Sequence, residues 1–466
     1  MVHMASWRRS SAPFEDRIPL LYLHRGRETG ADKMIASLSG IRGVLNVDMT
    51  LADASRFVVN FAAAVGSNEF LLARDPRKTG PALSKTVTAA MTSLGATVYD
   101  YGVISTPALF RESRRRGIPA VMVTASHNEP EFNGLKFIVD GSGIGQETFD
   151  AVVEGGKRRS EGFGNGSLKS APRCTYVDDL VERFGAGSCE GVKVAVDLGG
   201  GAAISHAVPL LRRLDCEVTS LNDAYGIFNR KVDPVVDDLE LLRKIVKRKG
   251  CDIGLGFDCD GDRLVIVDSA GRKRSGDFML SLALSELLFA TGEKKVVVST
   301  DTTQAVDDVA KKAGAQVLRA KVGEANVVGM MKERTARLGG EGSSGGLIDG
   351  SFNYCRDSML AALAIIRALK RKGRGFYESV PAYSQDRVAL ELPRAKALQG
   401  IRRLAKMQDN PDLTDGLKVM LPNRSWVLVR PSGTEDVVRV SAEARTSEEA
   451  ARVAKAYAKR LKELST

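Results

Sequence analysis

Three carboxylates alternate in the segment DCDGDR, at Asp258, Asp260 and Asp262, between two apolar runs that resemble buried strands. Carboxylates this close together repel one another unless a cation neutralises them, and their oxygens prefer Mg²⁺ or Ca²⁺ to zinc. An EF-hand loop would need Gly and Glu where Arg263 and Ser269 stand, so that interpretation fails. The triad predicts a magnesium site, and the alternative is a solvated acidic turn.

A serine follows another strand-like run, AVMV, in the segment AVMVTASHNEPEFNGLKF. Ser126 at this position could act as a nucleophile in phosphoryl transfer, provided that a base takes its proton and a cation meets the phosphate. His127 and Lys136 are residues of the right types within the next ten positions. The alternative is a capping serine in a polar turn. Ser126 has no GxSxG elbow around it, which disfavours a lipase-like hydrolase.

The segment VRPSGTEDVVRV follows a strand-like run near the C-terminal end of the sequence. It offers two guanidinium groups, two hydroxyls and a permissive backbone, at Arg430, Ser432, Gly433, Thr434 and Arg439. Guanidinium forks and hydroxyl and amide donors bind phosphate oxygens well, so the segment predicts a phosphate-binding loop. The alternative is a plain β-turn.

Two further glycine-containing segments could complete a binding site. GGEGSSGGLI places Glu341 and Ser343 where they could hold sugar hydroxyls, and a flexible loop is the alternative. Arg42 stands between glycines in LSGIRGV, and ARDPRKTG, which contains Arg77, follows another strand-like run. Both segments could add positive charge to a phosphate-binding cleft. No GxxxxGKS or GxxxxGKT segment is present, so a Walker-type ATP site is not predicted.

Alternating strand-like and helix-like stretches position these residues and predict α/β domains with mixed or parallel sheets. The predicted strands are FLLARD (70–75), AVMVTASH (120–127), VKVAVD (192–197), DIGLGFD (252–258), LVIVDSAG (264–271) and KKVVVST (294–300). The predicted helices cover residues 52–66, 80–95 and 239–250. The C-terminal segment combines strands at 426–433 and 437–444 with a helix at 448–464, which predicts an α+β unit.

The length of 466 residues is too great for one hydrophobic core, and polar stretches at 154–173 and 370–375 suit linkers. Organised sequence begins near Met34. The predicted parts are a disordered N-terminal extension (1–35), a domain with the serine (36–160), a domain with the metal-binding loop (174–275), a domain with the sugar-binding loop (276–372) and a domain with the phosphate-binding loop (376–466).

The composition limits the partners. The formal net charge is +11, but the basic runs are not interleaved with aromatic residues, so no nucleic-acid partner is predicted. No stretch approaches the roughly 18 apolar residues of a membrane span, and the start is a poor signal peptide. Six scattered cysteines without CxxC spacing predict reduced thiols and a cytoplasmic location. The sequence does not define the oligomeric state, and a homodimer remains an option.

Taken together and in this order, TASHN with NGLK, DCDGDR and RPSGTE resemble the α-D-phosphohexomutase superfamily over residues 36–466. The resemblance implies three α/β domains with mixed sheets and a C-terminal α+β domain around a central cleft. It implies that Ser126 is the phosphoserine and, with the three aspartates, a ligand of one Mg²⁺ ion. It also implies that Arg42 and Arg263 are active-site cations and that Lys136 is a proton carrier. A lysine in that role needs a lowered pKa, which a cationic cleft could provide.

Such an enzyme moves a phosphoryl group between carbons 1 and 6 of a hexose. The phosphoserine phosphorylates the substrate, the 1,6-bisphosphate turns around, and its other phosphate returns to the serine; the same bisphosphate would serve as activator. The chain departs from the family pattern at Glu129 and Asp436, where proline is usual, and in the sugar loop, which lacks a histidine after Glu341. This loop and CRDS (355–358) resemble an archaeal-type branch.

Glucosamine phosphate and mannose phosphate are the leading candidate substrates, with glucose phosphate as a third. Two other functions fit parts of the sequence. A haloacid-dehalogenase-type phosphatase also places DxD after an apolar strand, which would make Asp258 the nucleophile of a Mg²⁺-dependent phosphosugar phosphatase. A non-catalytic basic protein that has kept the fold would instead bind nucleic acid, with a steep dependence on salt.

Overall fold

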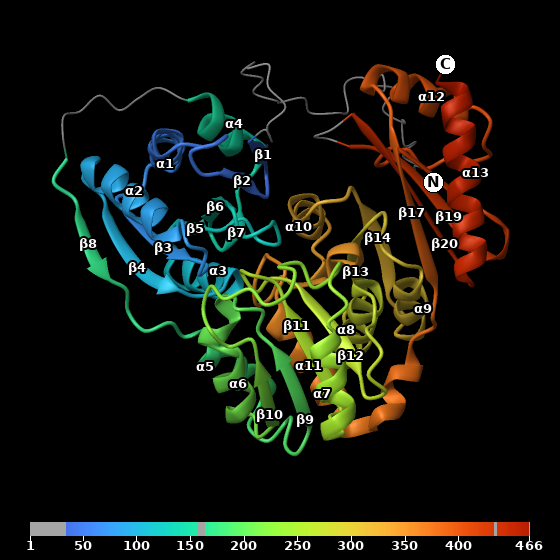
Figure 1. Ribbon diagram of the computed structural model, residues 1–466, viewed down its shortest axis with the longest axis horizontal. Helices are drawn as coiled ribbons and strands as arrows, with labels where there is room; N and C mark the ends of the chain where they lie inside the picture. The colour runs from blue at the N-terminus through green and yellow to red at the C-terminus, as the bar shows by residue number, and fades with distance from the viewer. Residues whose placement is uncertain (1–33, 156–163, 433–435, 466) are drawn as a thin grey trace, which may run out of the picture. The chain divides into compact units, whose positions relative to one another are not determined.

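The computed structural model describes residues 34–155, 164–432 and 436–465 of the chain (Figure 1). The predicted extension at 1–35 therefore lies almost entirely outside the described residues, and Ile35 already belongs to the first strand. The described strands form four sheets, each built from one contiguous stretch of the chain. Among the described helices, none is long and apolar enough to cross a membrane.

The first sheet has the strand order β1-β2-β6-β5-β3-β4-β8, with β7 paired to β6. The pairs from β5 to β8 are parallel, and those on the β6 side are antiparallel. Its strands are β1 (Ile35–Ser37), β2 (Gly40–Val44), β3 (Glu69–Arg74), β4 (Thr97–Val103), β5 (Ala120–Val123), β6 (Phe132–Val139), β7 (Ser142–Gly143) and β8 (Ser167–Ser170). Its helices are α1 (Leu51–Val65), α2 (Gly80–Ser93), α3 (Thr106–Arg116) and α4 (Gln146–Glu154).

The strand β8 lies within the stretch that was predicted to be a linker, so that prediction is wrong for these residues. β8 pairs in parallel with β4, from Ser167 opposite Thr97 to Ser170 opposite Asp100. Its side chains are half-buried or exposed. The strand is therefore held by backbone hydrogen bonds without an apolar face, and its sequence carries no alternating hydrophobic pattern.

The second and third sheets share one topology, in which three parallel strands are followed by an antiparallel fourth. The second sheet, in the order β10-β9-β11-β12, contains β9 (Lys193–Asp197), β10 (Glu217–Leu221), β11 (Ile253–Phe257) and β12 (Leu264–Asp268). The third, in the order β14-β13-β15-β16, contains β13 (Lys295–Ser299), β14 (Gln316–Ala320), β15 (Leu338–Glu341) and β16 (Gly346–Asp349). The helices of this part are α5 (Tyr176–Phe184), η2 (Ala202–Ser205), α6 (Ala207–Arg213), α7 (Glu240–Lys249), α8 (Gly276–Thr291), α9 (Ala305–Lys312), α10 (Glu324–Glu333), η3 (Gly342–Ser344), α11 (Ser358–Lys372) and η4 (Arg374–Ser379).

The same loop position carries the candidate chemistry in the first three sheets. Ser126 lies between β5 and its antiparallel neighbour β6, the aspartates lie between β11 and β12, and Glu341 ends β15 before the turn to β16. Each loop leaves the carboxyl end of a strand that has a parallel neighbour. This is the edge at which α/β proteins bind their ligands.

The fourth sheet is antiparallel, with the order β17-β20-β19-β18. Its elements are β17 (Ser384–Glu391), α12 (Arg394–Ala405), β18 (Leu417–Met420), η5 (Pro422–Arg424), β19 (Trp426–Pro431), β20 (Val437–Ala444) and α13 (Ser447–Leu464). It has a separate buried core, whereas the largest core cluster extends from the first sheet to the end of the third. The predicted strands, helices and α+β terminal unit are thus confirmed, with ends that differ by a few residues.

Candidate active site

Ser126 is fully buried and lies three residues after β5. Its φ angle of 53° falls in the left-handed region, which residues other than glycine rarely adopt. Its amide donates to Thr124 Oγ1 at 2.8 Å, and its hydroxyl donates to Asp258 Oδ2 at 3.2 Å. Ser126 does lie in a polar turn, but the turn leads into β6, so no helix follows that Ser126 could cap. A strained serine held against a carboxylate from another sheet is typical of a functional site.

Arg77 holds the Ser126 loop from behind. It donates to the carbonyl oxygens of Ser126 and Asn128, both at 2.7 Å, and of Phe132 at 3.0 Å. Its Nε atom pairs with Asp75 Oδ2 at 3.1 Å, and both side chains are fully buried. Arg77 was predicted to add positive charge to the cleft; instead its donors are used by the backbone of the loop.

The three aspartates of the DCDGDR segment gather in one buried place. One carboxylate oxygen from each of Asp258, Asp260 and Asp262 lies within 4.8 Å of the others. Asp260 Oδ1 and Asp262 Oδ1 have no hydrogen-bond partner among the described residues. Burial, together with the two neighbouring carboxylates, raises the pKa of Asp258 well above its usual value. The solvated-turn alternative is therefore wrong, and the free, buried oxygens suit a divalent cation.

Lys136 reaches the aspartates from β6. Its Nζ atom donates to Asp260 Oδ2 at 2.7 Å and to Asp262 Oδ2 at 3.1 Å. Burial alone would lower the pKa of Lys136, but the two carboxylates outweigh burial and raise it. The expectation of a lowered pKa is therefore wrong, and Lys136 is a fixed positive charge. Arg42, on β2, donates to Asn128 Oδ1 at 3.0 Å, and burial lowers its pKa to about 10, which leaves it charged.

His127 and Arg263 lie beside Ser126. Arg263 Nη1 donates to Asp233 Oδ2 at 3.1 Å, and its Nη2 lies 3.4 Å from His127 Nε2. Burial and the guanidinium groups of Arg263 and Arg42 lower the pKa of His127 to about 2. His127 is therefore neutral at pH 7: it can take part in hydrogen bonds, but it contributes no positive charge.

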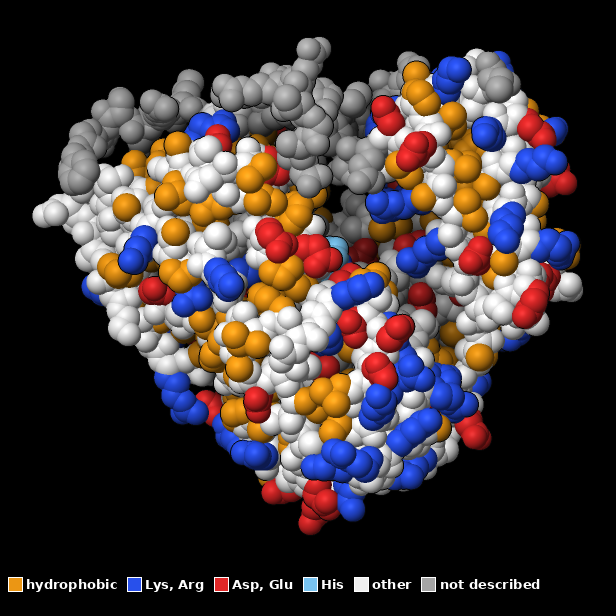
Figure 2. Space-filling model, viewed as in Figure 1, with side chains coloured by type: hydrophobic (Ala, Val, Ile, Leu, Met, Phe, Trp, Pro, Cys, Tyr) orange, Lys and Arg blue, Asp and Glu red, His pale blue; other side chains and the backbone are white. Residues whose placement is uncertain are grey.

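A cavity of about 360 Å³ opens at His127 and Arg263 and is lined from all four sheet regions, whereas Ser126 and the three aspartates lie behind its lining. Figure 2 shows basic, acidic and histidine side chains gathered around a hollow in the molecular surface. The residues that line the cavity are His127, Asp233, Val235, Val236, Arg263, Asp301, Val322, Ser343, Ser344, Arg387, Leu428, Arg430, Arg439 and Ser441. Four arginines and two hydroxyls of the sugar loop thus face one space that can hold a phosphorylated ligand.

The predicted sugar loop is ordered and lies at this cavity. Ser343 lines it directly, and Glu341 is buried at the end of β15. Glu341 Oε1 accepts the amide of Gly323 at 2.7 Å. Burial raises the pKa of Glu341, although the neighbouring Arg356 opposes this effect. The segment continues at once into η3 and β16, so it forms a defined turn between two strands.

The predicted phosphate loop is described only in part. Arg430 and Arg439 line the cavity from β19 and β20. Ser432 is buried, and its amide donates to the backbone oxygen of Val437 at 2.7 Å, so its side chain is placed at the start of the loop. The other two predicted members, Gly433 and Thr434, lie outside the described residues.

Several side chains at the site were not predicted from the sequence. Thr106 Oγ1 donates to Asp260 Oδ2 at 2.6 Å, and Arg356 Nη2 donates to Asp262 Oδ2 at 2.8 Å. The CRDS segment was a signal for Arg356, but nothing in the local sequence of Thr106 singles it out. The cavity-lining residues Asp233, Asp301 and Arg387 also stand in segments without a motif.

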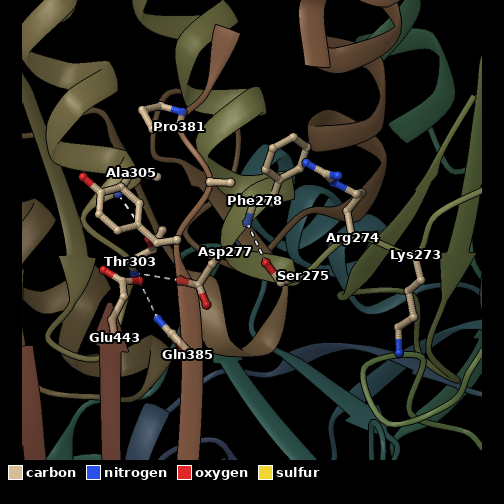
Figure 3. A pocket seen from close by; sticks show the side chains of 12 residues that line it. Lys273, Arg274, Ser275, Asp277, Phe278, Thr303, Ala305, Pro381, Gln385 and Glu443 are labelled. Carbon is tan, nitrogen blue, oxygen red and sulfur yellow. Dashed lines mark hydrogen bonds between the residues drawn. The ribbon is translucent and has the colours of Figure 1, made fainter. Parts of the chain in front are cut away.

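The sugar loop rests on a buried carboxylate behind it. Asp277 Oδ1 accepts the amide of Thr303 at 2.8 Å, and a Cβ atom on Gly342 would lie only 1.9 Å from the same oxygen. Figure 3 shows Asp277 beside Thr303, in a second cavity of about 330 Å³. Burial raises the pKa of Asp277 to about 7, aided by the carboxylates of Asp301 and Glu443 and opposed by the Thr303 amide.

We expect Asp277→Asn to stabilise the protein at pH 8 and to have little effect at pH 4. The folded state holds the Asp277 proton more tightly than the unfolded state does. Protonated Asp277 therefore stabilises the protein at low pH, and this stabilisation is lost as pH rises from about 4 through 7. Each unit by which folding raises the pKa of Asp277 corresponds to roughly 1.4 kcal/mol, so this loss is about 4 kcal/mol. The asparagine keeps an oxygen for Thr303 without the charge. Thermal unfolding of both proteins from pH 4 to pH 8 tests this, and parallel Tm curves would contradict it.

The arrangement defines a class of protein. A buried serine beside three carboxylates, with arginines around one cavity, provides the groups that a phosphoryl-transfer enzyme needs. The domain models of the phosphoglucomutase/phosphomannomutase family match most of the chain: α/β/α domain I at 33–161, domain II at 175–271, domain III at 275–385 and the C-terminal domain at 388–460. The chain belongs to this family and is a phosphohexomutase, an isomerase.

Known proteins resemble this chain both in sequence and in structure. A probable phosphoglucosamine mutase of Methanosarcina barkeri is 34% identical, over 87% of this chain and 94% of that protein. A phosphoglucomutase/phosphomannomutase of Thermococcus kodakarensis is 31% identical, over 88% and 94%. The crystal structure of a phosphoglucomutase/phosphomannomutase family protein from Burkholderia thailandensis matches with a TM-score of 0.81 at 25% identity, over 92% of this chain and 98% of that one. The predicted family, four-domain α/β architecture and mutase function are thus confirmed.

Proposed function

We propose that this enzyme interconverts the 6-phosphate and the 1-phosphate of glucosamine through a phosphorylated Ser126. The observation that carries the proposal is the position of Ser126, buried and strained at the end of β5 with its hydroxyl 3.2 Å from Asp258. Relatives named probable phosphoglucosamine mutase support this sugar. The relative named phosphoglucomutase/phosphomannomutase supports mannose and glucose phosphates as further candidate substrates.

The residues around Ser126 fit one Mg²⁺ ion. Asp258, Asp260 and Asp262 would hold it together with an oxygen on Ser126, and their hard oxygen donors suit this metal. Lys136 donates to the Oδ2 atoms of Asp260 and Asp262, whose Oδ1 atoms have no partner among the described residues and are available to a cation. When bound, the ion supplies positive charge next to the phosphoryl group that is transferred.

Phosphoryl transfer then requires an attacking hydroxyl and a route for its proton. The substrate oxygen bonds to phosphorus as the bond to Ser126 Oγ breaks, and the proton of the hydroxyl ends on Oγ. Because His127 Nε2 faces the Arg263 guanidinium, Nδ1 of the neutral ring carries the hydrogen; it has no partner among the described residues and can donate to an oxygen of the transferring phosphoryl group. Arg42 and Arg263 add positive charge beside the transferring group. The reverse transfer from the turned 1,6-bisphosphate restores the phosphoserine, and the same bisphosphate first loads Ser126.

The far side of the cavity would bind the part of the substrate that does not react. Arg430 and Arg439 supply two guanidinium groups for the non-reacting phosphate, with the loop that begins at Ser432. Glu341 and Ser343 supply a carboxylate and a hydroxyl for the sugar hydroxyls. The cysteines of the chain are free thiols, which supports the proposed cytoplasmic location.

The test is to incubate the purified protein with Mg²⁺, a trace of glucose 1,6-bisphosphate and one sugar phosphate at a time. The substrates are glucosamine 6-phosphate, mannose 1-phosphate and glucose 1-phosphate, and ³¹P NMR follows the products. We expect isomer formation, fastest with glucosamine 6-phosphate. Free phosphate without isomerisation would favour the phosphatase alternative, and no reaction with any of the sugars would overturn the proposal.

A further inference from the structure

Arg356 lies between the aspartates and the sugar loop, and the function proposed above gives it no role. It stands between β16 and α11 and is 7% exposed. Its Nη2 atom donates to Asp262 Oδ2 at 2.8 Å, and its Nη1 atom lies 3.5 Å from Glu341 Oε2. One guanidinium therefore contacts a candidate metal ligand and a candidate sugar ligand that are 79 positions apart in the sequence.

A glycine in the sugar loop leaves room for the Arg356 side chain. A Cβ atom on Gly346 would lie 2.2 Å from Arg356 Cδ and 2.4 Å from its Cγ, so only glycine leaves room there. Glu324, in the first turn of α10, anchors the base of the side chain: its Oε2 atom accepts the Arg356 amide at 2.9 Å and lies 3.1 Å from Nε. The guanidinium thus has a carboxylate on each of three sides: it donates a hydrogen bond to Asp262 and forms ion pairs with Glu324 and Glu341.

Each of the two carboxylates has one oxygen turned toward Arg356 and the other turned elsewhere. Asp262 Oδ2 is shared by Arg356 and Lys136, which leaves Oδ1 without a partner. Glu341 Oε1 accepts the Gly323 amide, which leaves Oε2 beside Arg356. The planar fork of one arginine can orient two carboxylates at once, whereas the point charge of a lysine cannot.

We propose that Arg356 is a positioning residue that couples the metal site to the sugar site. By holding Asp262 and Glu341 together, it sets the affinity for the divalent ion and the affinity for the hexose phosphate. Partners of metal ligands commonly change metal affinity by tenfold or more when they are removed. The inference rests on the proposed function, because it assigns Asp262 to the metal and Glu341 to the sugar.

The test measures both affinities in the full-length protein and in its Arg356→Lys and Arg356→Met variants. Mn²⁺ binding is followed by electron paramagnetic resonance of the free ion, and KM and kcat for glucosamine 6-phosphate are measured separately. We expect the Kd for Mn²⁺ to rise about tenfold and KM at least fivefold in both variants. Since Arg356→Lys keeps the charge, it separates orientation from electrostatic repulsion.

Two further variants serve as controls. Glu341→Gln is expected to raise KM and to leave the Kd for Mn²⁺ unchanged, because Asp262 keeps its arginine. Arg337→Met removes an arginine of the same domain whose Nε lies 3.2 Å from Asp349 Oδ1, outside the cavity lining, and should change neither constant. In the wild type, glucosamine 6-phosphate should tighten Mn²⁺ binding at least threefold. This measurement does not depend on whether any variant folds.

Unchanged Mn²⁺ binding in both Arg356 variants would overturn the inference, and so would the absence of coupling in the wild type. Tighter Mn²⁺ binding in Arg356→Met would show that Arg356 only repels the ion. The Mn²⁺ titration needs no turnover. If the wild type isomerises no sugar phosphate, the proposed function fails, while the Mn²⁺ constants still decide whether Arg356 orients Asp262.

Discussion

Ser126→Ala is expected to abolish the interconversion, with kcat lower by at least about four orders of magnitude. The hydroxyl of Ser126 is the only atom proposed to carry the phosphoryl group. The carboxylate in contact with it belongs to Asp258, whose Oδ1 already accepts the amides of Asp262 and Arg263, both at 3.1 Å. Mass spectrometry after incubation with glucose 1,6-bisphosphate checks the intermediate: the wild type should gain one phosphoryl group and the variant none.

Ser126→Gly is the matched control for folding. It should be as inactive as Ser126→Ala but more stable by about 1 kcal/mol, because glycine adopts a φ angle of 53° without the cost that a Cβ atom imposes. The Tm values of the two variants measure this difference. A phosphorylated Ser126→Ala protein would contradict the expected result and would make Asp258 the nucleophile.

Most of the fold was predictable, because its strands are buried runs with a strong local signal. Almost all residues of β11 and β13 are buried. β13 is rich in valine and β11 alternates apolar residues with glycine, and such runs between helical patterns indicate an α/β sheet. β8 was missed for the opposite reason. It is an edge strand whose side chains are mostly polar and are half-buried or exposed, and only its pairing with β4 makes it a strand.

The chemical loops were predictable as motifs, but their mutual contacts were not. Ser126 and Asp258 meet although they are 132 positions apart, and no local pattern specifies that contact. The pKa of Lys136 shows the consequence. A cationic cleft was expected to lower it, whereas the contacts with Asp260 and Asp262 raise it. Such effects depend on distances that only the folded chain defines.

The second large effect is expected at Arg77. Arg77→Met removes the donors to the carbonyl oxygens of Ser126 and Asn128 and leaves the buried Asp75 without its cation. Removing one partner of a buried ion pair costs about 3–5 kcal/mol, and the orphaned carbonyls add to this cost. We expect a clearly lower Tm and, at temperatures where the variant is still folded, a loss of kcat of at least about a hundredfold, because the strained Ser126 is no longer held in place.

Stability and activity should separate when the unpaired charge is also removed. In Asp75→Asn/Arg77→Met the uncompensated carboxylate is gone, so part of the lost Tm should return. The carbonyls of the Ser126 loop still lack their donor, so kcat should stay low. Arg367→Met removes one of the two arginines that pair with the buried Glu286, with Nε at 3.1 Å, and leaves the other, Arg371, in place. The pair lies outside the cavity lining, so this variant should lower Tm by less than Arg77→Met does and should not change kcat. Full activity in the double variant would mean that Arg77 only neutralises Asp75, and that the Ser126 loop keeps its strained conformation without it.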